Sequence, residues 1–160
     1  MLTIAPYHDE DRPALETFAA AIQDFERAFT PALRPGEEIA SAYIDYLLKR
    51  AGEVSGLILV AAEDERPVGF IAGWPEVDDD WLVDESMRRH GYVSDLFVVP
   101  EMRRHGVATA LLQAIETALH ERGCRRLRIC SKAMNAAALS TYRRAGFLPY
   151  EMILDKTLPD

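Results

Sequence analysis

The apolar positions of the chain follow two kinds of pattern, which succeed one another several times along the sequence. Runs of apolar residues between turn signals predict strands, and apolar residues three or four positions apart predict amphipathic helices. The predicted strands are residues 2–7, 56–62, 68–74, 92–99, 126–131 and 147–157, the last being a strand or a hairpin. The predicted helices are residues 11–29, 37–51, 107–122 and 135–145.

The order of these elements predicts an α/β (α+β) fold. We expect a mixed, mostly antiparallel twisted sheet with helices on both faces, in which residues 56–74 form a hairpin. Gly69 and Gly73 within the second strand of that hairpin predict a bulge or a close backbone approach. Gly52 is expected to end the second helix. A chain of 160 residues is long enough for one domain with its own core, so residues 1–160 are expected to form a single domain.

Composition and charge narrow the range of functions. The formal net charge of −8 argues against a nucleic-acid partner. Seven basic and three acidic side chains between residues 101 and 132 make one segment basic, which suits an anionic cofactor. Within it, we interpret Arg122, Arg125 and Arg126 as solvated residues.

The sequence also indicates where the protein works. No apolar run is long enough to span a membrane, and the first residues do not resemble a signal peptide. Cys124 and Cys130 lack the spacing of metal ligands, so no metal site is expected. Two reduced cysteines in a cytoplasmic protein are the simplest interpretation.

The most informative stretch joins the strand at residues 92–99 to the helix that follows. Pro100 ends the strand, and a basic turn, Met-Arg-Arg-His-Gly, occupies residues 102–106. The first N–H groups of a helix have no intrahelical partner, and the helix dipole adds partial positive charge there. Gly106 lets the main chain approach a ligand without a Cβ atom in the way. The turn therefore predicts a phosphate-binding site.

Two motifs resemble those of the GNAT superfamily of acyl-CoA-dependent N-acyltransferases. The turn contains Arg103-x-x-Gly106-x-Ala108, which fits the pattern Q/R-x-x-G-x-G/A. Residues 135–147 fit N-x-x-A-x-x-x-Y-x-x-x-G-F. The resemblance is clear over residues 57–156, and it implies acetyl-CoA as the acyl donor.

The resemblance also implies roles for the residues around the turn. The strand before it would pair with the pantetheine arm through Leu96, Phe97 and Val98, and the N–H groups there would polarise the thioester carbonyl. Arg103 and Arg104 would add positive charge, although Arg103 could instead cap the preceding strand. The pyrophosphate would bind the backbone N–H groups of Arg104, His105, Gly106, Val107, Ala108 and Thr109.

The second motif carries two polar candidates. Asn135 can cap its helix and also bond the pantetheine arm, because a side-chain amide has a donor and an acceptor end. Tyr142, seven residues later, faces the same way and is a plausible general acid for the departing thiolate.

The general base is not assigned by the motifs. Some members of the superfamily use a carboxylate on the strand after the central helix, where this chain has Cys130. Asp95 on the central strand is the best remaining candidate. The other candidates are Glu63, Asp78 to Asp80, His90, His105 and a water chain.

These features predict an N-acetyltransferase that moves an acetyl group from acetyl-CoA to a primary amine by direct attack. The acceptor would be a small molecule or a peptide. Six acidic residues between Glu76 and Glu85 form either a solvated loop or a surface that attracts a cationic acceptor. The alternative is a non-catalytic acyl-CoA-binding module that senses the cofactor or assembles with a partner, which the presence of Tyr142 disfavours. The oligomeric state stays open, with a homodimer as one option.

Overall fold

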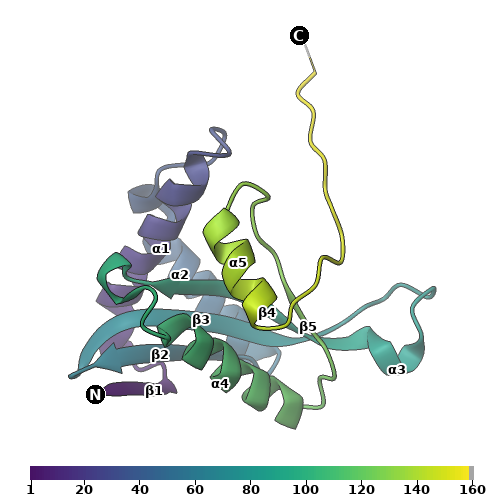
Figure 1. Cartoon of the computed structure of the whole chain (residues 1–160), viewed down its shortest axis with the longest axis horizontal. Coiled ribbons are helices and arrows are strands. Elements are labelled where there is room, and N and C mark those ends of the chain that lie inside the picture. The colour runs from purple at the N-terminus through teal and green to yellow at the C-terminus, as the bar shows by residue number, and fades with distance from the viewer. Residues whose placement is uncertain (159–160) are drawn as a thin grey trace.

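The fold is built on a five-stranded sheet, and the computed structural model describes residues 1–158 (Figure 1). The strands are β1 (Leu2–Pro6), β2 (Leu57–Glu63), β3 (Arg66–Val77), β4 (Arg89–Val98) and β5 (Leu127–Ile129). The helices are α1 (Arg12–Arg27), α2 (Gly36–Glu53), α3 (Glu85–Arg88), α4 (Val107–Glu121) and α5 (Ala136–Arg144). Two 3-10 turns, η1 (Asp9–Asp11) and η2 (Pro100–Met102), precede α1 and α4.

The strands lie in the order β1-β2-β3-β4-β5, so each pairs with its neighbour in sequence. The first three pairings are antiparallel, and β4 pairs with β5 in parallel across the connection that contains α4. The prediction of a mixed, mostly antiparallel sheet is therefore confirmed.

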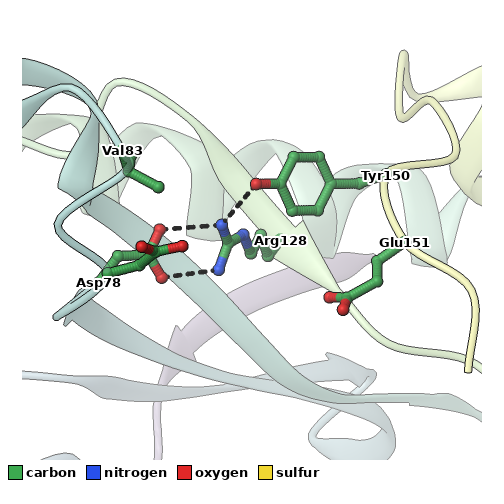
Figure 2. Close-up of a pocket in the computed structure, with 6 residues that line it drawn as sticks. Asp78, Val83, Arg128, Tyr150 and Glu151 are labelled. Carbon is green, nitrogen blue, oxygen red and sulfur yellow. Dashed lines mark hydrogen bonds and ion pairs between the residues drawn. The ribbon is translucent and has the colours of Figure 1, made fainter.

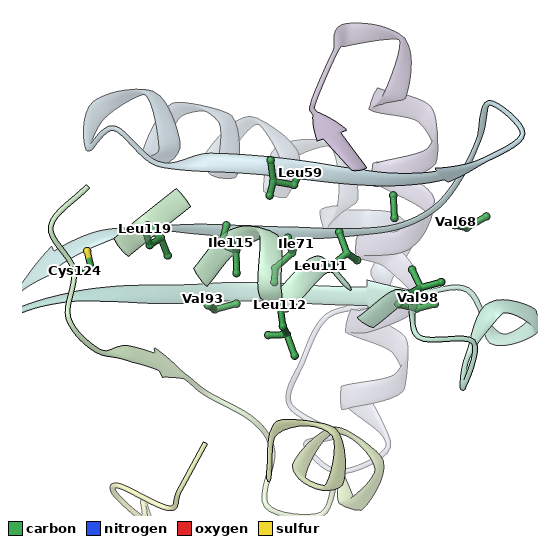
Figure 3. Close-up of a cluster of buried hydrophobic side chains, with 12 residues drawn as sticks. Leu59, Val68, Ile71, Val93, Val98, Leu111, Leu112, Ile115, Leu119 and Cys124 are labelled. Atoms are coloured by element: carbon green, nitrogen blue, oxygen red, sulfur yellow. The ribbon is translucent and has the colours of Figure 1, made fainter. Parts of the chain in front are cut away.

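Helices cover both faces of the sheet, as predicted, because side chains along each strand alternate between the two faces (Figure 1). On one face, α1 and α2 pack on Ile58, Val60, Phe70 and Trp74. On the other face, α4 packs on Leu59, Ile71, Val93 and Val98 through a stripe made of Val107, Leu111, Leu112, Ile115 and Leu119 (Figure 3). This second cluster holds α4, and with it the turn before it, at a fixed place above the strands.

A bulge on β4 changes which face its residues occupy. Val93 pairs with Gly73 and Asp95 pairs with Ala72, so Ser94 is one extra residue on β4. An extra residue reverses the alternation, and Asp95 consequently faces α2 although Val93 faces α4. The expected close approach is confirmed at Gly73, where a Cβ atom would lie 2.8 Å from the Tyr92 carbonyl oxygen.

Several predicted boundaries differ from the structure. Helix α2 continues through Gly52 to Glu53, because a glycine in the last turn weakens a helix without breaking it. Strand β3 extends to Val77, three residues beyond its predicted end, because it pairs along the full length of β4. Strand β5 has three residues instead of six, and α3 was not predicted.

The predicted strand or hairpin over residues 147–157 is wrong. Residues 148–158 form neither helix nor strand, and the segment runs away from the body (Figure 1). A strand needs a partner for its backbone groups, and this segment has none within residues 1–158.

Two further absences hold for residues 1–158. None of the helices there combines the length and the apolar character that crossing a bilayer requires. The same residues contain no group of three or more His, Cys, Asp or Glu side chains arranged to hold a metal ion.

Candidate active site

The turn between β4 and α4 exposes a row of backbone donors. Gly106, with φ of 84°, and Arg104, with φ of 65°, both adopt the left-handed conformation, which reverses the chain before the helix. The first main-chain bond of α4 runs from the Ala110 N–H to the Gly106 carbonyl. Within the described part of the chain, no N–H group from Arg104 to Thr109 donates to another main-chain carbonyl. These donors are therefore free for an anion.

The side chains of the turn have different surroundings. Arg103 donates from Nε to the Val98 carbonyl oxygen at 3.1 Å, so the capping role considered for it is present. The Nδ1 atom of His105 lies 2.9 Å from the Arg103 carbonyl oxygen, which holds the ring against the turn. Arg104 and His105 are exposed. The turn thus offers main-chain donors flanked by two arginines.

Strands β4 and β5 separate beside this turn. Their parallel pairing consists of Gly91 with Leu127, Tyr92 with Arg128, and Val93 with Ile129. Beyond Val93, β4 continues to Val98, and within residues 1–158 no strand pairs with it on the β5 side. Main-chain groups along Leu96, Phe97 and Val98 therefore have no strand partner on that side, and this unpaired edge of β4 leads towards the basic turn.

Asp95 lies one residue after the bulge, where the pairing of β4 with β5 has just ended. Its side chain is 7% exposed, and its carboxylate accepts hydrogen bonds from Ser94 Oγ at 2.6 Å and from Tyr43 OH at 3.0 Å. Burial raises the pKa of Asp95 above its ordinary value, and the bonds from Ser94 and Tyr43 partly offset that rise. A carboxylate with a raised pKa is a better proton acceptor near neutral pH.

The second motif places Tyr142 near Asp95. Asn135 caps α5, since its Oδ1 accepts the Ala138 N–H at 3.1 Å, and Tyr142 lies two turns later, with its ring 6.0 Å from that of Phe147. Burial, followed by the negative charge of Asp95, raises the pKa of Tyr142 to about 12. The phenol therefore keeps its proton at neutral pH and can donate it.

Comparison with known proteins now identifies the chain. A sequence model described as the acetyltransferase (GNAT) family matches residues 18–147. The chain belongs to this family. It is therefore an acyl-CoA-dependent acetyltransferase.

Individual relatives agree with this assignment. An uncharacterised N-acetyltransferase of Bacillus subtilis (strain 168), YhfO, is 28% identical over 136 residues, which cover 85% of this chain and 87% of YhfO. The Bacillus halodurans protein BH1408 has the same fold with a TM-score of 0.86, at 14% identity, and covers 98% of this chain and 99% of its own. The aminoglycoside N-acetyltransferase AAC(6')-Iy, crystallised with CoA, has the same fold with a TM-score of 0.72 at 18% identity. The match covers 99% of this chain and 95% of the AAC(6')-Iy chain.

The other base candidates of this acetyltransferase lie apart from the unpaired edge of β4 or are engaged elsewhere. Glu63 is on β2, which β3 separates from β4. His90 is 2% exposed, with Nδ1 3.1 Å from the Arg88 carbonyl oxygen, and His105 belongs to the turn. Cys130, just past β5, is an exposed free thiol.

Asp78 is held in an ion-pair cluster instead of a free loop (Figure 2). It pairs with Arg126 at 2.6 Å and with Arg128 at 2.9 Å, and Arg128 also donates to the Tyr150 hydroxyl at 3.0 Å. Partial burial opposes ionisation of Asp78, but the Arg128 hydrogen bond and neighbouring positive charges outweigh it and lower its pKa. The interpretation of Arg126 as a solvated residue is wrong, because its guanidinium pairs with Asp78 and its side chain is only 22% exposed. Arg122 is also engaged, since its Nε donates to the Ser55 carbonyl oxygen at 2.9 Å.

Sequence reasoning missed Tyr43 and Ser94 as parts of the site. Tyr43 occupies one of the apolar positions of α2, on the face that packs against the sheet. Its ring does pack there, and only its hydroxyl reaches the carboxylate. A tyrosine on an otherwise aliphatic helix face was the available signal, because a buried phenol needs a hydrogen-bond partner.

Proposed function

We propose that this protein transfers an acetyl group from acetyl-CoA to a primary amine by direct attack, with residues 1–160 acting as a single domain. The observation that carries the proposal is the end of the β4–β5 pairing at Val93, which leaves β4 unpaired between the buried Asp95 carboxylate and the free N–H groups of the turn. A long thioester with a diphosphate at its far end has main-chain groups to bind along this stretch.

In this proposal the main chain holds the donor. The pyrophosphate binds the N–H groups from Arg104 to Thr109, and the two arginines of the turn add charge. The pantetheine arm pairs with β4 along residues 96–98 and meets the side chain of Asn135. The N–H groups of the same strand polarise the thioester carbonyl and stabilise the oxyanion that forms.

Asp95 and Tyr142 move the protons. The amine nitrogen attacks the thioester carbon, the C–S bond breaks, and the proton lost by nitrogen passes to Asp95, directly or through a water. Tyr142 donates its proton to the departing sulfur, which leaves as the thiol of CoA. No covalent enzyme intermediate forms, so the positions of two substrates matter most.

A small-molecule amine is the acceptor that we favour. AAC(6')-Iy was crystallised with a bisubstrate analogue that joins CoA to an acetylneamine, and its chain has the same fold at 17% identity and a TM-score of 0.71.

Cys124 and Cys130 are both free thiols, which fits a reducing compartment such as the cytoplasm.

The test measures thiol release from acetyl-CoA with a panel of primary amines. Tyr142→Phe should lower turnover by roughly 10²- to 10⁴-fold, the usual contribution of a general acid, with unchanged acetyl-CoA affinity. The defect should shrink with a thioester whose thiol leaves without protonation. Tyr46→Phe is the control, since Tyr46 is half exposed and stacks on Tyr43. Binding of acetyl-CoA without thiol release for any amine would favour the alternative, a non-catalytic acyl-CoA-binding module.

A further inference from the structure

The face of α1 that packs on the sheet ends in a carboxylate. Leu15, Ala19 and Ile22 lie on this face and contact the sheet. Glu26 follows Ile22 by four positions, so it continues the same stripe beyond the last apolar contact. Its side chain is 32% exposed. A carboxylate at such a position loses part of its hydration and gains little packing in return, so stability does not account for it.

Glu26 lies near both groups to which we assign the proton transfers. Burial is the main cause of the raised pKa of Asp95, and the negative charge of Glu26 adds to it. Burial, followed by the charge of Asp95, raises the pKa of Tyr142 to about 12, and Glu26 adds to this rise as well. Because such effects fall with distance, the three side chains border one region, on the side where β4 has lost its partner β5.

A lysine on the far side of this region pairs with Glu26. The loop from β5 to α5 leans towards α1, and its Lys132 Nζ lies 4.0 Å from Glu26 Oε2 (Figure 1). Within residues 1–158, no other ion pair or side-chain hydrogen bond joins residues 131–147 to the rest of the chain. A distance of 4.0 Å is too long for a hydrogen bond, and Lys132 is 36% exposed. Pairs of this kind are weak, so a ligand can displace Lys132.

The chemistry of Lys132 indicates which ligand Glu26 takes. The end of a lysine side chain is a primary ammonium on an aliphatic chain. The attacking nitrogen of the acceptor has to be neutral, with its proton passed to Asp95, so it cannot be the cation that pairs with Glu26. A second nitrogen of the same acceptor can be that cation, because it takes no part in the reaction and keeps its proton.

We propose that Glu26 selects acceptors with two amino groups, and that it binds the ammonium of one while the other attacks the thioester. Lys132 occupies the place of that ammonium until the acceptor displaces it. The substrate class is therefore a diamine or a longer polyamine. This inference rests on the proposed function, since it concerns the acceptor of the same reaction, and it makes Glu26 a specificity-determining residue.

Binding without turnover is the first test. Straight-chain diamines of increasing length, each with the monoamine of equal length, are titrated calorimetrically into protein saturated with CoA, which has no acetyl group to transfer. Glu26→Gln should bind the best diamine roughly ten- to hundredfold more weakly, the usual contribution of one charge-assisted hydrogen bond. Its affinity for the monoamine should equal that of wild type. Equal diamine affinities for wild type and Glu26→Gln would overturn the proposal.

Glu16→Gln is the matched control. Glu16 lies on the same helix and has the same exposure, 32%, but it pairs with Arg12 at 2.9 Å. It is ten positions before Glu26 in the sequence, or about 15 Å along the helix. The variant therefore removes an equivalent charge away from Asp95, and it should bind both amines as wild type does.

Lys132→Met distinguishes a ligand site from a structural ion pair. Methionine keeps an unbranched side chain and removes the charge that competes with the acceptor. Diamines should bind this variant roughly two- to fivefold more tightly than wild type, which is the worth of an exposed ion pair. A structural pair predicts the opposite, because losing either partner would disturb the same loop. A loss of diamine affinity in Lys132→Met as large as that in Glu26→Gln would overturn the proposal.

Thiol release from acetyl-CoA shows whether the bound diamine is the acceptor. In Glu26→Gln, the ratio of kcat/KM for the diamine to kcat/KM for the monoamine should fall roughly ten- to hundredfold, mainly through KM. An effect of Glu26 on the pKa of Asp95 acts on both amines alike and cancels in this ratio. If the diamine binds through Glu26 but no amine releases thiol, the acetyl transfer is wrong and the binding site stands. If both amines are acetylated and the ratio is unchanged, the acetyl transfer stands and selection by Glu26 is wrong.

Discussion

The hydroxyl of Tyr43 lies 3.0 Å from each carboxylate oxygen of Asp95, which ties α2 to the bulge of β4. Burial, and then the charge of Asp95, raises the pKa of Tyr43 far above its ordinary value, so the phenol acts as a donor. Its hydrogen bond lowers the pKa of Asp95, against the larger effect of burial. Tyr43 thereby keeps the candidate base ionised to a lower pH than burial alone would allow.

Tyr43→Phe should therefore move the acidic limb of the pH profile of kcat/KM to higher pH. The charged group near Asp95 is Glu26 from α1. The neighbouring tyrosines of α2, β4 and α5 have raised pKa values and stay neutral, and Ser94 still donates in the variant. At pH values on the acidic limb, kcat/KM of the variant should be lower than that of wild type. On the plateau at higher pH, the two proteins should have similar kcat/KM. Tyr46→Phe, which removes a neighbouring hydroxyl with no bond to Asp95, should leave the limb in place. A uniform loss of activity at all pH values would show that Tyr43 only supports the fold.

Asp95→Asn should produce a protein with strongly reduced turnover that is more stable than wild type at neutral pH. The folded-state pKa of Asp95 is raised above its unfolded value, so between those two values the folded state binds more protons. The protonated carboxyl of Asp95 therefore contributes stability that is lost as pH rises through its folded-state pKa. Asn does not ionise, so the variant does not lose this stability. Turnover should fall roughly 10²- to 10⁴-fold. Thermal unfolding should show a higher Tm for the variant at pH 7 and no gain near the ordinary Asp pKa of 3.8. A lower Tm at pH 7 would mean that the carboxylate stabilises the fold.

The sequence predicted the features that depend on local chemistry. The strand, basic turn and helix over residues 92–122 appear as expected, because Pro100 and Gly106 determine where the strand stops and the helix begins. The apolar stripe of α4 follows helical spacing and packs on the sheet as expected. Asn135 caps α5, as its place before a helix predicts.

Features that depend on contacts between distant segments could not be predicted. Tyr43 and Asp95 are 52 positions apart, and Asp78 and Arg126 are 48 apart. No periodicity links such pairs, so each side chain was interpreted from its own surroundings. The predicted strand over residues 147–157 shows the same limit, since alternation indicates a strand but does not show whether an edge is available to pair with it.

Thr109→Asp should weaken the binding of acetyl-CoA without harming the fold. Thr109 is exposed in the first turn of α4, where a carboxylate favours the helix dipole but repels a pyrophosphate. Repulsion of about 1 to 4 kcal/mol at 4 Å, depending on the local dielectric, corresponds to roughly five- to a thousandfold weaker binding. Thr117→Asp places the same charge about 12 Å farther along the helix and should bind nearly normally. Calorimetric titration with acetyl-CoA measures the affinity of both variants, and their Tm values check that the fold is intact. Equal binding by both would place the phosphates elsewhere.

The acidic residues between Glu76 and Glu85 differ in how free they are to attract a cationic acceptor. Asp78 is neutralised by two arginines, Glu76 accepts the Trp74 Nε1–H, and Asp80 and Asp84 accept N–H groups of the loop itself. Asp79 and Glu85 are both exposed and have no such bonds within residues 1–158. Any attraction exerted by this loop should therefore come mainly from these two residues.

Asp79→Asn combined with Glu85→Gln should lower kcat/KM for a polycationic amine and flatten its salt dependence, with little change for a monoamine. Such attraction is long-range and screened over about 8 Å at physiological salt. Asp64→Asn combined with Glu65→Gln is the control for charge number, because it removes one Asp and one Glu charge at the other end of β3, roughly 36 Å away at about 3.3 Å per residue. Asp64 there forms an exposed ion pair with the N-terminal ammonium, which does not involve the loop. The control should keep the salt dependence of wild type. If both double variants and wild type give parallel curves of efficiency against ionic strength, the loop is a solvated surface and the acceptor is selected by contacts beside the unpaired edge of β4.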